Sequence, residues 1–342
     1  MISRAGVCVC GGGHIAHSLV AAVSETEDVL CLTRRPERWS DRLECDRADA
    51  GFRPCAHRVA ATSDPAAVAG ARFVVVALPR FAIEEEMTRI LPFLGSGQIV
   101  CFVPAPGDAA RWRDVLAERG VACAGFQRVP FVSRTAEYGR SVRISAPRAV
   151  HRIAVSDPAL EPELSAFCRR FLGGEASFLS SFLLFAFSNS NPLLHPARLV
   201  PLFRGWKSRT YGRIPLFYEE WTDESSVLYV AADRELRDVC SRFPEIDLDR
   251  DYVPVLRHYG VSSIPALTAK LRGIPGFKGI ASPMVPGPGG FVPDLSSRYF
   301  TEDVPFGTVP IQRHARSRGV ETPVIDFLVG EIARIRNPPE PI

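Results

Sequence analysis

The sequence lacks several features that would place it in a broad class at once. Its 342 residues contain no apolar run long enough to cross a membrane and no signal-peptide pattern, so we expect a cytoplasmic protein without a membrane partner. A net charge of +3 is too small to indicate binding of nucleic acid. There is no internal repeat or low-complexity tract, and the length suffices for two ordinary domains.

Disulfide and metal-binding patterns are also missing. The chain has nine cysteines but no C-x-x-C pair, so we expect buried, reduced thiols and no metal site. Several of them lie in apolar, strand-like runs, namely Cys8, Cys10, Cys31 and Cys101. His14 and His17 are three residues apart without an acidic or thiol pattern beside them, and we interpret both as surface or packing histidines.

What the sequence does contain begins at its start. A short apolar strand, Gly6–Cys10, leads into three glycines and an apolar helix, His14–Val23. The small residues follow the pattern G-x-G-x-x-A, with Gly11, Gly12, Gly13 and Ala16 in order. In such a strand–turn–helix unit, Gly11 allows the tight turn, Gly13 lets a pyrophosphate approach the backbone, and Ala16 lets the helix pack closely on the sheet. The helix N-terminus favours the anion, so we predict dinucleotide binding.

The end of the second strand, Val29–Thr33, indicates which dinucleotide binds. In NAD-binding units an Asp or Glu about 20 residues after the glycine motif usually bonds the ribose hydroxyls. This chain has Thr33-Arg34-Arg35 there, and two arginines would bind a 2′-phosphate through charge-assisted bonds. We therefore predict NADP(H) in preference to NAD(H), with Thr33, Arg34 and Arg35 at the cofactor. The alternative is a solvated basic turn.

Strands and helices alternate through the first half of the chain. Apolar strands such as Arg72–Leu78 are what a parallel sheet requires, and Pro79 at the carboxyl end of this strand lies where doubly wound folds bind ligands. Near Ser156 the strand patterns give way to helical ones. The sequence therefore predicts an α/β protein with a Rossmann-type doubly wound parallel sheet in residues 1–156 and an all-α domain in residues 157–342.

Two segments of the second half carry further expectations. Ala176–Phe187 is apolar almost all round, so we predict a buried helix there. Ser282–Pro293 is rich in glycine and proline, and we predict a loop.

Three stretches of this half contain polar groups that a core helix would not select: residues 188–196, 217–224 and 297–307. Asn191 and His195 are four residues apart in the first, so one helix face could present both. A histidine followed by proline is usually structural, and Asp303 in the third stretch could merely cap a helix. Residue types alone therefore leave a catalytic role open.

Taken together, these motifs resemble a known family. The Asn-x-x-x-His-Pro stretch at 191–196, the Arg-Tyr-x-Thr-Glu-Asp-Val-Pro-x-Gly stretch at 298–307 and the N-terminal glycine motif are similar to those of the octopine/nopaline (opine) dehydrogenases. The resemblance implies a Rossmann domain followed by an all-α domain. It also implies reductive condensation of an amino acid's amine with a 2-keto acid, using NADH or NADPH. A subset of the family makes opine-type metallophores from larger amine substrates.

The resemblance also assigns residues by position. It implies that His195 is the catalytic histidine, Asp303 its partner and Arg298 the substrate-binding arginine. His195 would exchange a proton at the substrate nitrogen or carbonyl oxygen while Asp303 orients it. Arg298 would hold a substrate carboxylate through two parallel bonds. Asn191 would position substrate or nicotinamide, or only cap the turn before Pro192.

Two other functions stay open. One is an NADP-dependent ketone or 2-keto acid reductase of ketopantoate-reductase type. It would need a catalytic lysine, whereas the three lysines, Lys207, Lys270 and Lys278, lie in no strong motif. The other is a non-catalytic NADP-sensing protein, which would not need the proton-transfer residues. The sequence identifies neither the amine nor the keto acid, and it is compatible with a homodimer.

Overall fold

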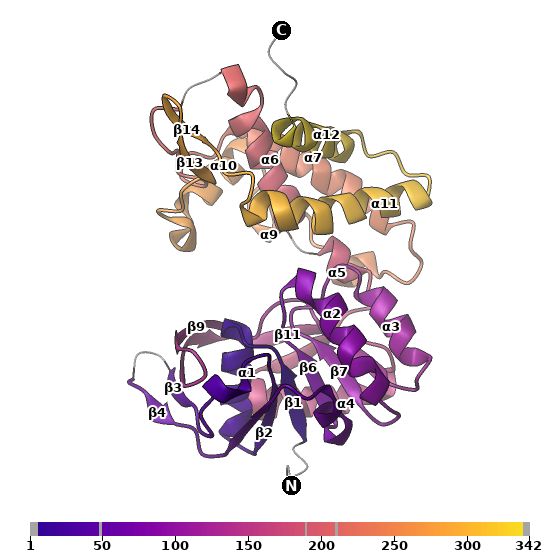
Figure 1. Cartoon of the computed structure of the whole chain (residues 1–342). Helices are drawn as coiled ribbons and strands as arrows, with labels where there is room; N and C mark the ends of the chain where they lie inside the picture. The colour runs from indigo at the N-terminus through magenta and orange to yellow at the C-terminus, as the bar shows by residue number, and fades with distance from the viewer. Residues whose placement is uncertain (1–5, 48–49, 189, 209–210, 338–342) are drawn as a thin grey trace. The chain divides into compact units, whose positions relative to one another are not determined.

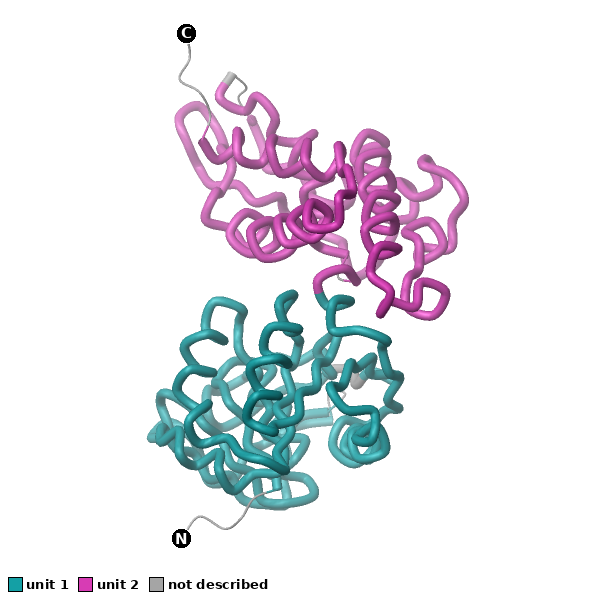
Figure 2. Tube along the Cα trace, turned by 90° about the vertical axis from the view of Figure 1, so that its right-hand side faces the viewer, with its two compact units in different colours: residues 1–185 teal, residues 186–342 magenta. Residues whose placement is uncertain are grey.

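The structure is a computed structural model in which residues 6–47, 50–188, 190–208 and 211–337 are described. The chain forms two compact units, residues 1–185 and residues 186–342, coloured teal and magenta in Figure 2. The first unit is built on a largely parallel sheet and the second on helices (Figure 1). The predicted α/β fold class, with a Rossmann-type sheet followed by a helical domain, is confirmed.

Eight strands form the main sheet of the first unit, in the order β12-β11-β8-β7-β6-β1-β2-β5. Their bounds are β1 Val7–Cys10, β2 Val29–Leu32, β5 Val59–Thr62, β6 Phe73–Val76, β7 Ile99–Phe102, β8 Ala122–Phe126, β11 Val150–Val155 and β12 Glu175–Phe178. The strands from β8 to β5 are parallel, and β11 is antiparallel to β8. The chain runs outward from β1 through β2 to β5 and then crosses to β6. Ligands of such sheets bind beyond the carboxyl ends of the strands where the order reverses, here between β1 and β6.

Both faces of this sheet are buried, as its apolar and β-branched strands require. On one face pack helix α1 (His14–Ser24), helix α4 (Glu161–Phe167) and the π-helix η5 (Cys168–Leu172). Helix α3 (Ala109–Ala117) packs against β8, and helix α2 (Arg80–Ile90) follows β6. The short 3₁₀ helices are η1 Pro36–Arg38, η2 Pro65–Gly70, η3 Leu91–Phe93 and η4 Pro158–Leu160. All nine cysteines are buried, as expected.

A second, four-stranded sheet lies beside α1. Its order is β4-β3-β10-β9, with bounds β3 Glu44–Arg47, β4 Arg53–Pro54, β9 Phe131–Glu137 and β10 Ser141–Pro147. Only β10 was expected as a strand from the sequence. The first residues of β9 alternate between buried and exposed positions, which is the period-2 signal of a half-buried strand. Helix α1 contacts both β9 and β10.

The boundary between the compact units differs from the one expected near Ser156. Residues after it continue the first unit, because β12 pairs in parallel with β11 and extends the main sheet. Phe167 of α4 packs on Phe73 of β6, with ring centroids 4.7 Å apart. The predicted helix Ala176–Phe187 was wrong: the segment contains β12 and then the short helix α5 (Leu184–Phe187). An apolar run of this length cannot distinguish a buried strand from a buried helix.

The second unit is helical with one small hairpin. Its helices are α6 Asn191–Phe203, α7 Asp223–Cys240, α8 Leu248–Asp251, α9 Val255–His258, α10 Ile264–Gly273, α11 Val309–Ser317 and α12 Pro323–Arg336, with the 3₁₀ helices η6 Trp206–Ser208 and η7 Pro275–Phe277 and the π-helix η8 Tyr299–Thr308. Helix α6 packs against α7, α12 and η8. The expected loop at 282–293 instead contains the antiparallel strands β13 (Met284–Gly287) and β14 (Gly290–Pro293). None of the described helices is long and apolar enough to cross a membrane.

Candidate active site

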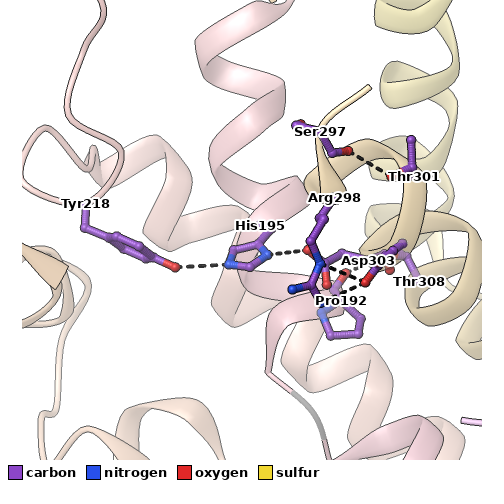
Figure 3. Close-up of polar contacts among 9 residues, drawn as sticks. Pro192, His195, Tyr218, Ser297, Arg298, Thr301, Asp303 and Thr308 are labelled. Atoms are coloured by element: carbon purple, nitrogen blue, oxygen red, sulfur yellow. Dashed lines mark hydrogen bonds and ion pairs between the residues drawn. The ribbon is translucent and has the colours of Figure 1, made fainter. Parts of the chain in front are cut away.

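The two prolines around His195 determine how helix α6 meets η8. Pro196 has no N–H, so the carbonyl oxygen of Pro192, four residues earlier, cannot accept the usual helical bond from it. The hydroxyl of Thr308 donates to this oxygen at 2.5 Å. A buried carbonyl that lacks its helical partner therefore becomes the attachment point of the segment that carries Asp303 (Figure 3).

The close approach of these two elements requires a glycine. A Cβ atom placed on Gly307 would overlap the ring of Pro192. The Gly at the end of the Arg-Tyr-x-Thr-Glu-Asp-Val-Pro-x-Gly stretch is therefore explained by packing, because any larger residue would push η8 away from α6. Gly307 and Thr308 together set the distance between the helix of His195 and the helix of Asp303.

His195 and Asp303 form a hydrogen-bonded pair in this interface. His195 Nδ1 lies 2.7 Å from Asp303 Oδ2, and His195 is 7% exposed. On its other side, Nε2 lies 3.0 Å from the hydroxyl of Tyr218. A carboxylate accepts only, so Nδ1 carries the proton in the neutral ring and Nε2 accepts from Tyr218. Figure 3 shows the three side chains in line, with the imidazole between the phenol and the carboxylate.

Tyr218 is fixed by its surroundings. Its ring stacks on Phe277 with centroids 4.0 Å apart and is almost parallel to the ring of Trp221, at 7°. Burial raises the pKa of Tyr218, and the nearby Tyr299 and Asp303 raise it further, so the phenol stays protonated. The carbonyl of Phe217 just before it accepts a 3.0 Å bond from Nε of the buried Arg198.

Arg298 and Asn191 flank this pair. Arg298 immediately precedes η8, and its side chain is 83% exposed. Nε and Nη2 of Arg298 both bond to Oε2 of Glu302, at 2.9 and 2.8 Å. Asn191 is the first residue of α6 and lies about one turn before His195, with a partly buried side chain. The structure thus brings the four predicted residues of the second unit to one junction, between the start of α6 and η8.

The glycine loop of the first unit lines a cavity of about 310 Å³. Its walls are Gly11, Gly12, Gly13, Leu32, Thr33, Arg34, Arg35, Leu78, Pro79, Ala82, Glu86 and Tyr138. The cavity lies at the carboxyl ends of β1, β2 and β6, where the strand order reverses. Every predicted cofactor residue lines it except Ala16, which packs beneath the loop.

The three glycines have different steric surroundings. Gly11 has φ +143°, and a Cβ there would lie 2.5 Å from the carbonyl oxygen of Ala77 and 3.3 Å from Cβ of Ala16. At Gly12 it would lie 2.6 Å from the hydroxyl of Tyr138. At Gly13 nothing lies within 4 Å, so the protein itself does not require a glycine there. Open space at Gly13, beside an α1 N-terminus that has no side-chain cap, fits an approaching pyrophosphate.

Arginine and glutamate side chains lie close together at one end of the cavity. Arg34, at the end of β2, forms a 2.6 Å ion pair with Glu85 of α2, and both side chains are exposed. Arg35 is also exposed. The buried carboxylate of Glu86 lines the cavity and pairs with Arg89 at 2.7 Å. An anionic ligand in this part of the cavity would therefore meet acidic side chains as well as the two arginines.

Known proteins are similar to this chain over almost its whole length. A family model described as the α-helical domain of NAD/NADP octopine/nopaline dehydrogenases matches residues 178–335. Octopine dehydrogenase of Pecten maximus is 27% identical over 94% of this chain and 88% of its own. Opine dehydrogenase of Haliotis discus hannai is 25% identical over 96% and 89%. A solved octopine dehydrogenase in complex with NADH and agmatine superposes with a TM-score of 0.84 at 25% identity, over 97% of this chain and 89% of that one.

The second unit matches the α-helical domain of the octopine/nopaline dehydrogenases, and the whole chain is similar to opine dehydrogenases. The resemblance found in the sequence is thereby confirmed. This similarity supports an NAD(P)-dependent oxidoreductase that acts on CH–NH bonds. A ketopantoate reductase with a TM-score of 0.63 at 18% identity shares only the fold.

Sequence reasoning missed several residues, one beside His195 in the second unit and others around the glycine loop of the first. Tyr218 lay within the polar stretch 217–224, but nothing local distinguished it from its neighbours. Tyr138 comes from the hairpin between β9 and β10, more than a hundred residues from the glycine loop. His17 binds that hairpin as well: Gly139 N–H donates to His17 Nε2 at 2.7 Å, and Nδ1 donates to the carbonyl of Gly13 at 2.9 Å. His17 is therefore a packing histidine that steadies the loop.

Among the described residues, no group of three or more His, Cys, Asp or Glu side chains could hold a metal ion. His14 instead accepts the backbone N–H of Thr135 at 2.9 Å.

Proposed function

We propose that this opine dehydrogenase is NADPH-dependent. It would join the amine of an amino acid, or of an amino-acid-derived metallophore precursor, to a 2-keto acid through an imine that is then reduced. The observation that carries the proposal is the pair of His195 Nδ1 and Asp303 Oδ2 at 2.7 Å, in the helical unit that the family model matches. An imidazole held by a carboxylate is suited to exchanging protons near neutral pH.

The chemistry divides between the cofactor and the chain. The nicotinamide supplies the hydride when it is bound. His195 takes and returns the protons that imine formation requires, and Asp303 stabilises the imidazolium and fixes the tautomer. Arg298 would hold a substrate carboxylate by two bonds, for which the carboxylate must compete with Glu302. Asn191, close to His195 on α6, would position the substrate.

The preference for NADP(H) is supported by the walls of the cavity in the first unit. Thr33, Arg34 and Arg35 line it, and no acidic residue ends β2, where an NAD-binding unit usually has one. A 2′-phosphate would gain charge-assisted bonds from the two arginines. Gly11, Gly12, Gly13 and Pro79 would surround the pyrophosphate and the adjacent ribose.

The relatives define which amines and keto acids to test. Solved octopine dehydrogenases have been obtained with arginine, agmatine and pyruvate, and a relative from Arabella iricolor is a tauropine dehydrogenase. Arginine, taurine and nicotianamine-like precursors therefore belong in the amine panel, with pyruvate among the keto acids. We also propose a cytoplasmic enzyme, to be tested by cell fractionation, and a homodimer, to be tested by sedimentation.

The deciding experiment is oxidation of NADPH by the pure protein against a grid of amines and 2-keto acids, with NADH in parallel. Turnover that requires both an amine and a keto acid is expected. Turnover with a keto acid alone would favour a ketopantoate-reductase-like ketone reductase instead. NADPH binding without turnover for any pair would favour a sensing protein. Faster turnover with NADH than with NADPH would contradict the cofactor preference.

A further inference from the structure

Both ring nitrogens of His195 are engaged within the second unit. Nδ1 faces Asp303 at 2.7 Å, and Nε2 faces the hydroxyl of Tyr218 at 3.0 Å. The imidazole therefore has no free nitrogen with which to meet a substrate. Either the substrate displaces Tyr218, or a proton reaches His195 through the Tyr218 hydroxyl.

The packing of Tyr218 disfavours displacement. Its ring stacks on Phe277 at 4.0 Å, and its carbonyl accepts the N–H of Trp221 at 3.0 Å. The residue before it is held from α6, because Arg198 Nε donates to the carbonyl of Phe217. Moving the phenol away from Nε2 would break aromatic contacts on a buried ring and strain an anchored backbone.

We propose that Tyr218 is a third member of the proton-transfer group and relays protons between the substrate nitrogen and His195. The proposal rests on the proposed function, since it concerns the path of the proton in that reaction. It makes Tyr218 the side chain that touches the substrate, with His195 as the proton store behind it and Asp303 as the stabilising charge.

The step balances without any further reagent. An N–H bond of the substrate ammonium breaks, the electron pair stays on nitrogen, and the proton goes to the Tyr218 oxygen. The original Tyr218 proton passes to His195 Nε2, which becomes an imidazolium beside Asp303. In the reverse direction the imidazolium returns a proton through Tyr218 to the hydroxyl of the carbinolamine, whose C–O bond breaks to release water. Tyr218 is neutral before and after each transfer, and no electrons are gained or lost.

The charged and titratable groups around the phenol suit this role. Asp303 and Tyr299 approach it from η8, His195 from α6, and Tyr259 from the end of α9. Burial and these neighbours raise the pKa of Tyr218, which keeps its proton available for donation over the physiological range. A phenol that ionised readily would lose the hydrogen bond to Nε2.

The test is Tyr218→Phe, assayed with the amine and keto acid that wild-type turnover identifies. A relay predicts a fall in kcat of about 100-fold or more, with little change in KM. It also predicts that the residual rate lacks the acidic limb of the wild-type pH–rate profile. Tyr211→Phe is the matched control, because its hydroxyl bonds the carbonyl of Leu202 at the other end of α6, and kcat should stay within about threefold of wild type.

Displacement predicts the opposite pattern. Tyr218→Phe would then keep or raise kcat, because no hydroxyl needs to move, and would keep the acidic limb; that result would overturn the relay. Wild-type turnover tests the proposed function, whereas the ratio of variant to wild type tests the relay, so the two failures are distinguishable.

A second variant covers the case in which Tyr218→Phe does not fold. Incorporation of a fluorinated tyrosine at position 218 keeps ring and hydroxyl but acidifies the phenol. The relay predicts that the alkaline decline of kcat moves to lower pH in this variant, and an unmoved profile would contradict it. Thermal unfolding and NADPH binding of each variant report whether the fold is intact.

Discussion

The two functional regions of this enzyme are built in opposite ways. The cavity of the first unit takes its floor from one contiguous segment, residues 11–13, and a basic wall from the residues that follow β2. The proton-transfer site instead joins the start of α6, the loop around Tyr218 and the π-helix η8, which lie far apart in the sequence. A site built from one segment tolerates substitutions in other parts of the chain. A site built from three segments depends on every contact that holds those segments together.

The largest effect is expected at the centre of the joined site. His195→Ala should lower kcat by about 100-fold or more while NADPH still binds, because the proton acceptor is lost and the first unit is untouched. Steady-state kinetics and fluorescence titration of NADPH would measure the two effects. His258→Ala, which changes an exposed histidine of the same unit, is the control. Near-wild-type turnover of His195→Ala would remove this residue from the mechanism.

The next largest effect is expected when the contact that docks η8 on α6 is lost. Thr308→Val removes the hydroxyl bonded to Pro192 and leaves a buried carbonyl without that partner, which lowers the free energy of unfolding by about 1–3 kcal/mol. Since η8 carries Asp303, we expect kcat to fall about tenfold as the pair with His195 loosens.

Thr308→Ser keeps the hydroxyl and serves as the control, which should retain both stability and kcat. Denaturant unfolding and kinetics of the two variants would test the argument. A Val variant that loses stability but keeps full kcat would show that docking does not set the geometry of the pair.

The same contrast explains what the sequence could reveal. The glycine motif, the basic end of β2 and the position of Pro79 could be interpreted locally, because each is recognised from residues that are adjacent in sequence. The role of Tyr218 could not, because Nε2 of His195 meets it only after α6 and the following loop have packed. The fold shows the same division: β1 and α1 followed from a local pattern, whereas β12 is a strand only because β11 lies beside it.

One missed element did carry a local signal. The segment 282–293 was expected to be a loop, yet Gly287 pairs with Gly290 across a two-residue turn, and Gly289 and Gly290 have positive φ values of +73° and +147°. A glycine-rich pair between two extended segments is typical of a tight hairpin turn.

Substitutions at the cavity of the first unit should change the affinities for NADPH and NADH differently. Replacing Arg34 and Arg35 together by Gln should raise the Kd of NADPH by about tenfold and spare NADH, because only the 2′-phosphate bonds to them. Arg42→Gln, on the exposed surface of the same unit, is the control. Equal weakening of both cofactors would contradict the assignment of these arginines to the 2′-phosphate.

A single substitution beside Arg34 should strengthen NADPH binding, though by a smaller factor. Glu85→Gln releases Arg34 from its ion pair and removes a negative charge near the expected phosphate, so NADPH should bind about threefold more tightly at low salt. Glu84→Gln is a close control, because Glu84 pairs with Arg111 instead. Titrations at two salt concentrations would show whether the gain is electrostatic, and an unchanged Kd would mean that Glu85 does not compete.

The smallest expected effect is a pH-dependent change in the stability of the first unit. His151 of β11 is buried, and among the described residues neither of its ring nitrogens has a hydrogen-bond partner. Burial lowers its pKa, and the nearby Arg148 lowers it further, so the unfolded chain binds a proton that the folded one resists. Stability from this residue is therefore full above the unfolded pKa of about 6.5 and falls below it, by at most about 1.4 kcal/mol per pH unit.

His151→Leu removes that proton uptake and should flatten the pH dependence of unfolding of the first unit. The gain in Tm should be larger at pH 5.5 than at pH 8, as scanning calorimetry would measure. His57→Gln, which changes an exposed histidine of the same unit, is the control. The pH profile of kcat should stay unchanged in His151→Leu, because the groups that titrate during turnover belong to the second unit. A shift of that profile would instead couple the sheet to the proton-transfer site.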